Sequence, residues 1–248
     1  MKKIYFLIGP IVFIVIWELV YLSQIINNFF LPSPQEVFLS LITLFSSLSI
    51  FLDLGITAQR VFISLTLAII IGFPIGLLLG YYEKVYASLE VLIDFFRSIP
   101  PIALFPLFVL ILGIGDSSKI GAAIFAATLL IIFNTAKGII NTKKTRILAA
   151  KLMGATKKQI FGKILLWESL PQTIIGLRTA ASFSLVVIVA TEMFIGTYAG
   201  LGRRIIDFQY IYNVSGMYAV ILITGLFGFA LNFVFIWLEK RYVHWYGK

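Results

Sequence analysis

Long apolar runs constrain the fold of this 248-residue chain more than any other feature. The stretch from Val61 to Tyr82 contains no charged residue, and neither does the stretch from Ile120 to Ala136. A helix of about 20 such residues crosses the hydrocarbon core of a bilayer. Charged residues make up only 12% of the chain, whereas soluble domains carry about 25%. A soluble fold would expose large apolar patches, so the sequence predicts an all-α polytopic membrane protein.

Six transmembrane helices are expected. They fall within Ile4–Leu22, Val61–Tyr82, Ile102–Leu112, Ile120–Ala136, Thr179–Thr197 and Gly216–Leu238. The third is expected to be broken by Pro106, and the fifth is interrupted by Glu192. The basic start of the first run also fits a signal peptide, but no small-residue cleavage site follows it, which favours a retained span.

The segments between these runs carry turn and interface signals. Two prolines in Leu31–Pro34 are expected to end one helix and begin another. Polar residues recur every three or four positions from Glu36 to Asp53, which predicts a helix lying on the bilayer surface, and Val85–Phe96 has a similar character. Gly113–Ser118 is expected to form a turn, and Tyr198–Tyr212 a loop.

The basic residues predict the orientation of the chain. If the N-terminus is cytoplasmic, all but four of the 20 basic residues fall on the cytoplasmic side; the four exceptions are Arg60, Lys119, Arg203 and Arg204. This asymmetry places both termini in the cytoplasm. It also explains the net charge of +9 without a nucleic-acid partner. His244 beside Trp245 is interpreted as an interfacial anchor.

The longest basic interruption runs from Arg146 to Arg178, and it carries helical signals. Gly154 divides it into two pieces, of which the second begins with Thr156 and Gln159 at capping-box spacing. An apolar stripe of Ile160, Phe161, Ile164 and Leu165 follows, and Pro171 is expected near the end of that helix. A basic loop that only fixes orientation would explain the lysines. The ordered small residues, glycine and cap favour a segment that docks against a partner in water.

The composition excludes several kinds of catalytic site. There is no cysteine and a single histidine, so thiolate sites, histidine clusters and Ser-His-Asp triads are not expected. A phosphate-binding loop needs Gly-x4-Gly-Lys-[Ser/Thr], but Gly162-Lys163 is followed by Ile164 and lacks the first glycine. ATP hydrolysis, if used, must come from another polypeptide.

A few residues within the spans are candidates for function. A carboxylate in a span is costly, so Glu192 either serves a solute pathway or forms a structural pair, for example with Arg203 or Arg204. Asn134 and Asn232 are expected to bind helices together. Pro100, Pro101 and Pro106 form either a hinge or kinks that only accommodate packing.

Short motifs in a fixed order resemble the permeases of ATP-binding cassette (ABC) importers. In the basic segment, Ala149-Ala150, Gly154-Ala155, Ile164, Pro171 and Gly176-Leu177-Arg178 resemble the EAA loop of that family. The other motifs are Leu31-Pro32-Ser33-Pro34, Arg97-Ser98-Ile99-Pro100-Pro101, Pro106-Leu107, Gly113-Ile114-Gly115, Thr191-Glu192-Met193, Gly200-Leu201-Gly202 and Leu238-Glu239-Lys240-Arg241 with Trp245. Together they resemble the nitrate/sulfonate/taurine branch over nearly the whole chain. Two departures are Leu148 at the loop glutamate position and Trp167 at the first loop proline.

The resemblance implies a type I ABC importer permease fold with six transmembrane helices and a cytoplasmic coupling helix. Residues 1–53 would hold an N-terminal transmembrane helix and an interfacial helix, residues 54–240 the permease domain, and residues 146–178 the EAA-like coupling loop. The residues expected to couple to an ATPase are Ala149, Ala150, Gly154, Ala155, Thr156, Ile160 and Phe161. Those expected along the substrate pathway are Glu192, Arg97, Pro100 and Pro101, and neither a catalytic residue nor a metal ligand is expected.

The resemblance also implies partners and a mechanism. The partners would be two cytoplasmic ABC ATPase subunits, a second permease copy in a homodimer, an extracytoplasmic substrate-binding protein and the lipid bilayer. This chain would bind no cofactor, because ATP with Mg²⁺ would sit on the ATPase. Closure of the ATPase dimer would move the coupling helices and switch the spans between outward- and inward-facing states. The solute imported would be small and anionic or heterocyclic.

The alternative function is an ATP-independent membrane carrier or channel. Such a protein is expected to show two comparable halves, and no internal repeat is visible in this sequence. A membrane-embedded enzyme would need acidic, serine or histidine residues clustered within the spans, whereas the acids here are scattered.

Overall fold

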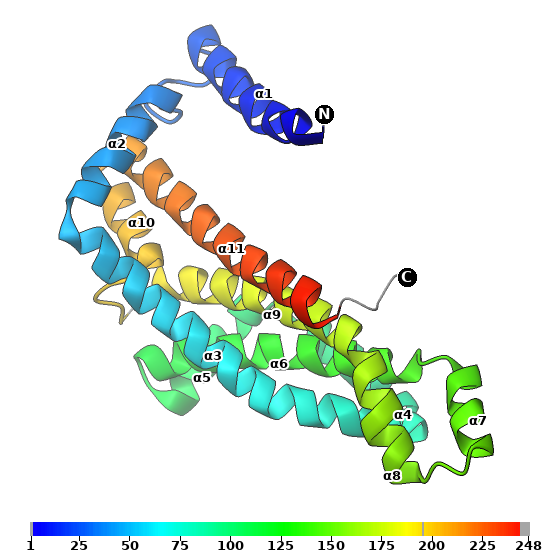
Figure 1. Cartoon of the computed structure of the whole chain (residues 1–248). Coiled ribbons are helices and arrows are strands. Elements are labelled where there is room, and N and C mark those ends of the chain that lie inside the picture. The colour runs from blue at the N-terminus through cyan, green and yellow to red at the C-terminus, as the bar shows by residue number, and fades with distance from the viewer. Residues whose placement is uncertain (1, 195, 244–248) are drawn as a thin grey trace. The chain divides into compact units, whose positions relative to one another are not determined.

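The computed structural model describes residues 2–194 and 196–243, and the elements assigned there are helices. They are α1 (Lys2–Ser23), α2 (Pro34–Ser46), α3 (Leu48–Tyr81), α4 (Glu83–Ser98), the 3₁₀ turn η1 (Pro101–Leu104), α5 (Phe105–Leu112), α6 (Asp116–Ile140), α7 (Lys144–Leu152), α8 (Lys157–Ile160), the π-helical turn η2 (Phe161–Leu165), α9 (Leu166–Glu192), α10 (Leu201–Tyr210) and α11 (Val214–Tyr242), as Figure 1 shows. His244 and Trp245, interpreted above as an anchor, lie outside the described residues.

The chain divides into two compact units, described here one at a time. The first consists of residues 1–56 and 198–226. In it, the Trp17 indole of α1 donates a hydrogen bond to the Pro32 carbonyl (3.0 Å). As the two prolines predict, α2 begins at Pro34, and a Ser33–Glu36 capping box closes its first turn.

An ion pair in this unit joins residues far apart in sequence. The buried Asp53 carboxylate accepts the backbone N–H of Gly200 (2.9 Å) and the Nε–H of Arg204 (2.7 Å). The first contact fixes the chain at the residue before α10, and the second involves the first turn of that helix. Asp53 is therefore buried and connects α3 to the start of α10, whereas the sequence predicted that it ends a helix on the bilayer surface.

The second unit consists of residues 57–197 and 227–248, and its core is made by α3, α6 and α9. Gly72, Gly76 and Gly80 form one face of α3 that lies against α6. A Cβ on Gly76 would come within 2.7 Å of the Thr135 Cβ, and one on Gly80 within 2.8 Å of the Ile139 Cβ. Small residues at four-residue spacing let the two helix backbones approach closely, as is common between membrane helices.

Helices α6 and α9 lie side by side in the same unit (Figure 1). Gln172 on α9 donates to the Asn134 side chain on α6 (3.0 Å), and the hydroxyls of Thr173 and Thr135 meet at 3.3 Å. The prediction that Asn134 binds helices together is therefore confirmed.

Four helices in the described part of the chain are long and apolar enough to cross a membrane. They are Leu48–Tyr81, Asp116–Ile140, the continuous helix Lys157–Glu192 and Val214–Tyr242. A fifth crossing is obtained if Glu83–Ser98 and Pro101–Leu112, which meet at a bend of 84°, are counted as one broken span. The apolar part of α1 from Ile8 to Ser23 is shorter. The third expected span is thus only the eight residues of α5 after η1.

The prolines act differently from the sequence expectation. Pro106 stands in the first turn of α5, where its missing N–H costs no helical hydrogen bond, so it does not break that helix. Pro171 lies inside α9 and is buried, and the helix continues 21 residues beyond it to Glu192. The prediction that a helix ends near Pro171 is wrong, because packing in a membrane bundle re-satisfies the backbone groups that a proline releases.

Several expected boundaries also move. The surface helix expected from Glu36 to Asp53 is divided at Ser47, and its last residues open the long helix α3, which crosses the expected domain boundary at residue 53. The expected turn Gly113–Ser118 ends early, because α6 begins at Asp116. The expected loop Tyr198–Tyr212 contains helix α10. The fifth expected span begins well before Thr179 and ends at Glu192.

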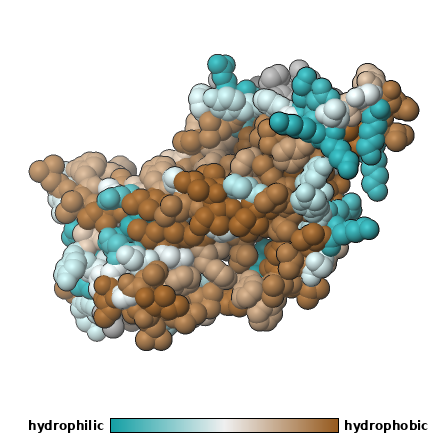
Figure 2. Space-filling model, turned by 90° about the horizontal axis from the view of Figure 1, so that it is seen from below, coloured by the Kyte–Doolittle hydropathy of each residue, from teal (hydrophilic) through white to brown (hydrophobic). Residues whose placement is uncertain are grey.

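The surface agrees with a membrane environment. On the face that Figure 2 shows, hydrophobic side chains prevail, and many of the hydrophilic ones gather toward the upper right of the view. Large apolar side chains of α1, α3 and α11 are exposed, among them Phe13, Ile70 and Phe229. Lipid, and not protein, is the solvent that such side chains fit.

Candidate functional site

The basic segment forms two short helices joined at a glycine. Helix α7 ends at Leu152, and Gly154 takes a left-handed backbone conformation (φ +80°) that turns the chain toward α8. Thr156 caps α8, accepting from the Gln159 N–H, while the Gln159 side chain accepts from the Thr156 N–H. The division at Gly154 and the capping box are both confirmed.

The apolar stripe of this segment packs mainly against the protein's own helices. Ile160 and Leu165 are buried in a cluster with Ala150 of α7 and Ile139 of α6. The Phe161 ring contacts the Tyr81 ring edge to face, with centroids 5.4 Å apart. Of the residues expected to couple to an ATPase, Ala150, Ile160 and Phe161 therefore hold the segment onto the helix bundle.

An exposed apolar patch remains at the end of α7. Leu148 is 61% exposed, Leu152 84% and Met153 81%, and we call these three residues the α7 patch. A shallow cavity of about 320 Å³ adjoins it, lined by Ala150, Met153, Gly154, Ala155, Gln159, Ile160, Lys163 and Ile164. Ala149 and Thr156 are exposed as well. The four-residue spacing of Leu148 and Leu152 indicates that both lie on one face of α7. The sequence does not indicate whether that face packs against the rest of the protein or is exposed.

An ion pair fixes the base of the segment. Arg146 of α7 contacts Glu168 in the first turn of α9. The π-helical turn η2 joins α8 to α9 without interruption, so the segment and the span form one continuous helix, Lys157–Glu192. The helix that follows the Gly154 turn therefore runs without interruption to Glu192.

Glu192 belongs to a buried network of charges at the other end of that helix. Its carboxylate is fully buried, pairs with Arg60 of α3 (Nη1–Oε1 2.6 Å) and accepts from the Thr57 hydroxyl (2.9 and 3.0 Å). Arg60 also reaches Asp116 at the start of α6 (2.8 Å). Lys119 of α6 is fully buried and donates to the Gly196 carbonyl (3.1 Å).

In this network Glu192 is paired with a residue of another helix of the bundle. The network joins α3, α6 and α9, and pairing offsets the cost of burying the Arg60 and Glu192 charges, while Asp116 at the edge of the network is 56% exposed. The sequence expectation named Arg203 or Arg204 as the ionic partner, but Arg203 pairs with Asp207 (2.9 Å) and Arg204 with Asp53. The partner observed for Glu192 is Arg60, which the sequence analysis placed among the outside charges and did not single out.

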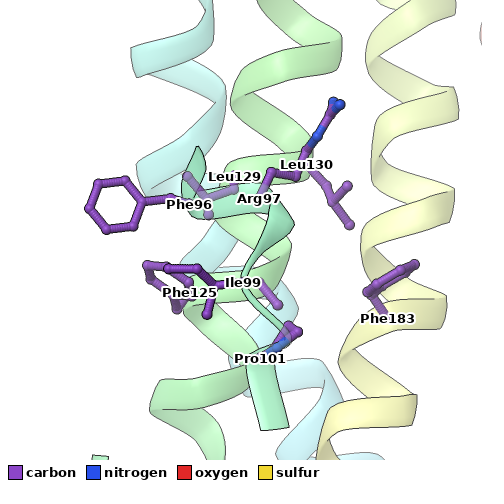
Figure 3. Close-up of a pocket in the computed structure, with 9 residues that line it drawn as sticks. Phe96, Arg97, Ile99, Pro101, Phe125, Leu129, Leu130 and Phe183 are labelled. Atoms are coloured by element: carbon purple, nitrogen blue, oxygen red, sulfur yellow. The ribbon is translucent and has the colours of Figure 1, made fainter. Parts of the chain in front are cut away.

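Arg97 and Pro101 line a cavity whose lining does not include Glu192. It measures about 240 Å³ and is formed by Phe96, Arg97, Ile99, Pro101, Phe125, Ala126, Leu129, Leu130 and Phe183 (Figure 3). Pro100 sits at the bend between α4 and η1 and is not among the lining residues. Of the four residues expected along a substrate pathway, Glu192 thus lies in an ionic network, Arg97 and Pro101 line an open, mostly apolar cavity, and Pro100 lies at the bend beside it.

No group of three or more histidine, cysteine, aspartate or glutamate side chains arranged to hold a metal ion occurs in residues 2–194 and 196–243. Several acids of the described structure are paired with basic residues, as in Glu90–Lys137 (2.8 Å) and Asp53–Arg204 (2.7 Å). The arrangement offers ionic ties between helices, and the cavities of the described residues include one beside the α7 patch and one around Arg97.

Comparison with known proteins gives consistent matches. A sequence profile of the family described as "Binding-protein-dependent transport system inner membrane component" matches residues 68–244. A putative ABC transporter permease protein of Methanocaldococcus jannaschii is 34% identical over 244 residues, which cover 95% of this chain and 90% of that protein. The taurine transport system permease protein TauC of Escherichia coli K12 is 28% identical over 242 residues, covering 96% and 88%. Among solved structures, an inward-facing form of the MetNI methionine ABC transporter superposes with a TM-score of 0.65 at 26% identity, covering 75% of this chain and 92% of that one.

Proposed function

This chain belongs to the family of binding-protein-dependent transport system inner membrane components, and on that premise we propose how its parts serve transport. It is a multi-pass membrane protein and the permease subunit of an ABC importer with a type I fold. The observation that carries this conclusion is the family match over residues 68–244, which includes the basic segment, α9 and Glu192.

We propose that the α7 patch and its adjoining cavity receive a cytoplasmic ABC ATPase. Leu148, Leu152 and Met153 project from a segment whose remaining apolar residues are already covered. Lys151 and Lys163 flank this surface, so an apolar ridge or pocket with acidic neighbours is the complementary surface on the ATPase. Gly154, Ala155 and Thr156 shape the turn behind the patch, and Ala150, Ile160 and Phe161 transmit its movement to the bundle.

Two ATPase subunits, one for each copy of a permease homodimer, complete the importer in this proposal. ATP with Mg²⁺ binds to those subunits, and this chain supplies neither a cofactor site nor a catalytic residue. An extracytoplasmic binding protein delivers a small anionic or heterocyclic solute. Both termini and the basic segment face the cytoplasm in this proposal, which the distribution of lysine and arginine supports.

The test is reconstitution in proteoliposomes. The chain is co-expressed with a candidate ATPase, reconstituted in vesicles and supplied with a candidate binding protein. Uptake of solute is then measured with and without ATP on the side of the membrane where the ATPase lies. Uptake that depends on both ATP and binding protein is the expected result. Uptake by the chain alone, without nucleotide, would instead support an ATP-independent carrier.

A further inference from the structure

The cavity around Arg97 lies at the middle depth of the second unit. Phe125 and Leu129 belong to the central turns of α6, and Phe183 to the central turns of α9. In Figure 3, Phe183 lies on one side of the space, and Ile99 and Pro101 lie on the other. Transporter solute sites are commonly found near the bilayer midplane, where broken helices meet continuous ones. Here the break is the 84° bend at Ile99–Pro100.

Arg97 supplies the charge of this cavity. It is the one charged residue among those that line the space, and its side chain is 37% exposed. The guanidinium lies over the Phe133 ring, 4.0 Å from its centroid, and approaches Asp94 only at 3.5 Å. A guanidinium carries five N–H donors, so its forked face can still receive an anion.

A neighbouring residue pair on α4 and α6 forms a short salt bridge, with which the Arg97 contacts can be compared. Lys137 of α6 and Glu90 of α4 meet at 2.8 Å, one helical turn or two from the Phe133–Arg97 contact. Arg97 has no contact of that quality among the described residues. Because its side chain is 37% exposed and its ion pair with Asp94 is long at 3.5 Å, the guanidinium is expected to face water or a ligand.

The rest of the lining restricts the body of the ligand. Phe96, Phe125 and Phe183 present aromatic surface, and the other neighbours of Arg97 in the cavity are aliphatic. An inorganic anion would lose its hydration shell here for a single cation, whereas a flat apolar body gains contact with the rings. The volume of about 240 Å³ lies below the 300–1,000 Å³ typical of drug-sized ligands, which fits one small ring with an acidic group.

We propose that this cavity is a solute-binding site within the permease itself, selective for a small aromatic monoanion, a sulfonate or a carboxylate. Arg97 binds the acidic group, and Phe125 and Phe183 contact the ring. The role of the site in import rests on the function proposed above, whereas the binding of the ligand does not. The site gives the permease a preference of its own, in addition to that of the binding protein.

The experiment is equilibrium dialysis of benzenesulfonate against the full chain in lipid nanodiscs at pH 7. Arg97→Gln is expected to weaken binding about tenfold or more, since a charge-assisted hydrogen bond is lost. The affinity of Arg97→Lys for benzenesulfonate should lie between that of the unaltered chain and that of Arg97→Gln, because lysine keeps the positive charge but lacks the two parallel N–H donors of the guanidinium. Arg203→Gln is the matched control, because Arg203 is also 38% exposed but pairs with Asp207 on α10, and it should bind like the unaltered chain.

A neutral ligand distinguishes the loss of the Arg97 charge from a general disturbance of the fold, because only the second would weaken its binding. Benzenesulfonamide has the same ring without the charge, so it should bind about tenfold more weakly than benzenesulfonate and be indifferent to Arg97→Gln. Phe183→Ala should weaken both ligands. Equal binding of benzenesulfonate by the unaltered chain and Arg97→Gln, or displacement of it by equimolar nitrate, would overturn the proposal.

Recruitment of the ATPase is measured on the same preparations. A chain that recruits the ATPase but does not bind benzenesulfonate would overturn the solute site and leave the permease function standing. A chain that binds benzenesulfonate through Arg97 but recruits no ATPase would support the site and count against the proposed coupling.

Discussion

Arg60 and Glu192 form a buried ion pair, 2.6 Å between Nη1 and Oε1, that joins α3 to the end of α9. The Thr57 hydroxyl and Asp116 extend the pair to a second turn of α3 and to α6. The charge of the Glu192 carboxylate is therefore compensated by neighbours on the adjacent helices.

Removing one partner of this pair should be more harmful than removing both. Glu192→Met leaves the Arg60 guanidinium buried beside fewer acceptors, and we expect a loss of roughly 3 kcal/mol in the free energy of unfolding. In the double variant Arg60→Met/Glu192→Met the loss should be smaller than that of Glu192→Met alone, because no unpaired guanidinium remains buried. Thermal unfolding in detergent measures this, with Arg203→Gln as the surface control. Additive losses would show that the two side chains act independently.

The α3–α6 contact should be sensitive to a single methyl group. Gly76→Ala places a Cβ within 2.7 Å of the Thr135 Cβ, so α3 and α6 must separate, and we expect destabilisation of about 1–3 kcal/mol. Gly55→Ala on the same helix meets nothing within 4 Å and should be neutral or stabilising by up to about 1 kcal/mol. Comparison of the two melting temperatures checks the contact, and equal behaviour would contradict it.

The turn at Gly154 should depend on its left-handed backbone and not on space. Nothing lies within 4 Å of a Cβ added there, but φ is +80°. Asn tolerates this conformation and β-branched residues do not. Gly154→Val should therefore reduce co-purification of the ATPase several-fold, while Gly154→Asn should retain most of it. Membrane insertion, measured by fractionation, should be unchanged in both.

The α7 patch should be required for docking and dispensable for folding. Leu152→Glu replaces an 84% exposed apolar residue with a charge, so the fold should tolerate it while ATPase recruitment falls at least tenfold. Ile160→Glu places a charge in the buried cluster of Ile139 and Ala150 and should destabilise the chain itself. A chain with Leu152→Glu that still recruits the ATPase normally would refute the docking surface.

The sequence predicts those parts of the fold that depend on local chemistry. The Thr156–Gln159 capping box and the helix start at Pro34 each involve residues within three positions of one another, so one segment is enough to recognise them. The charge-free runs predict the long helices for the same reason.

The features that escaped prediction depend on distant partners. Asp53 lies inside α3, and its carboxylate is bound by the backbone N–H of Gly200, 147 residues away. No local sequence signal indicates this contact. Glu192 finds Arg60 across 132 residues, although two arginines stand much closer in the chain. Pro171 resembles a helix end in sequence, but burial keeps the helix intact.

Which residues of the basic segment are covered could not be predicted either. The stripe of Ile160 and Leu165 has the pattern of a docking face, yet it is already occupied by Ala150 and Ile139. The pattern reveals that a face is apolar, whereas its partner is decided by how α6 and α7 approach it.

The unbroken helix from Lys157 to Glu192 would carry a movement at one of its ends to the other. Its 36 residues extend roughly 54 Å at 1.5 Å per residue. A rotation of about 5° around its centre would displace each end by about 2 Å in opposite directions, which is comparable to the helix shifts that accompany switching in other proteins. One end follows the turn behind the α7 patch and the other carries the ion pair with Arg60, so a single helix would link the proposed docking surface to that ion pair.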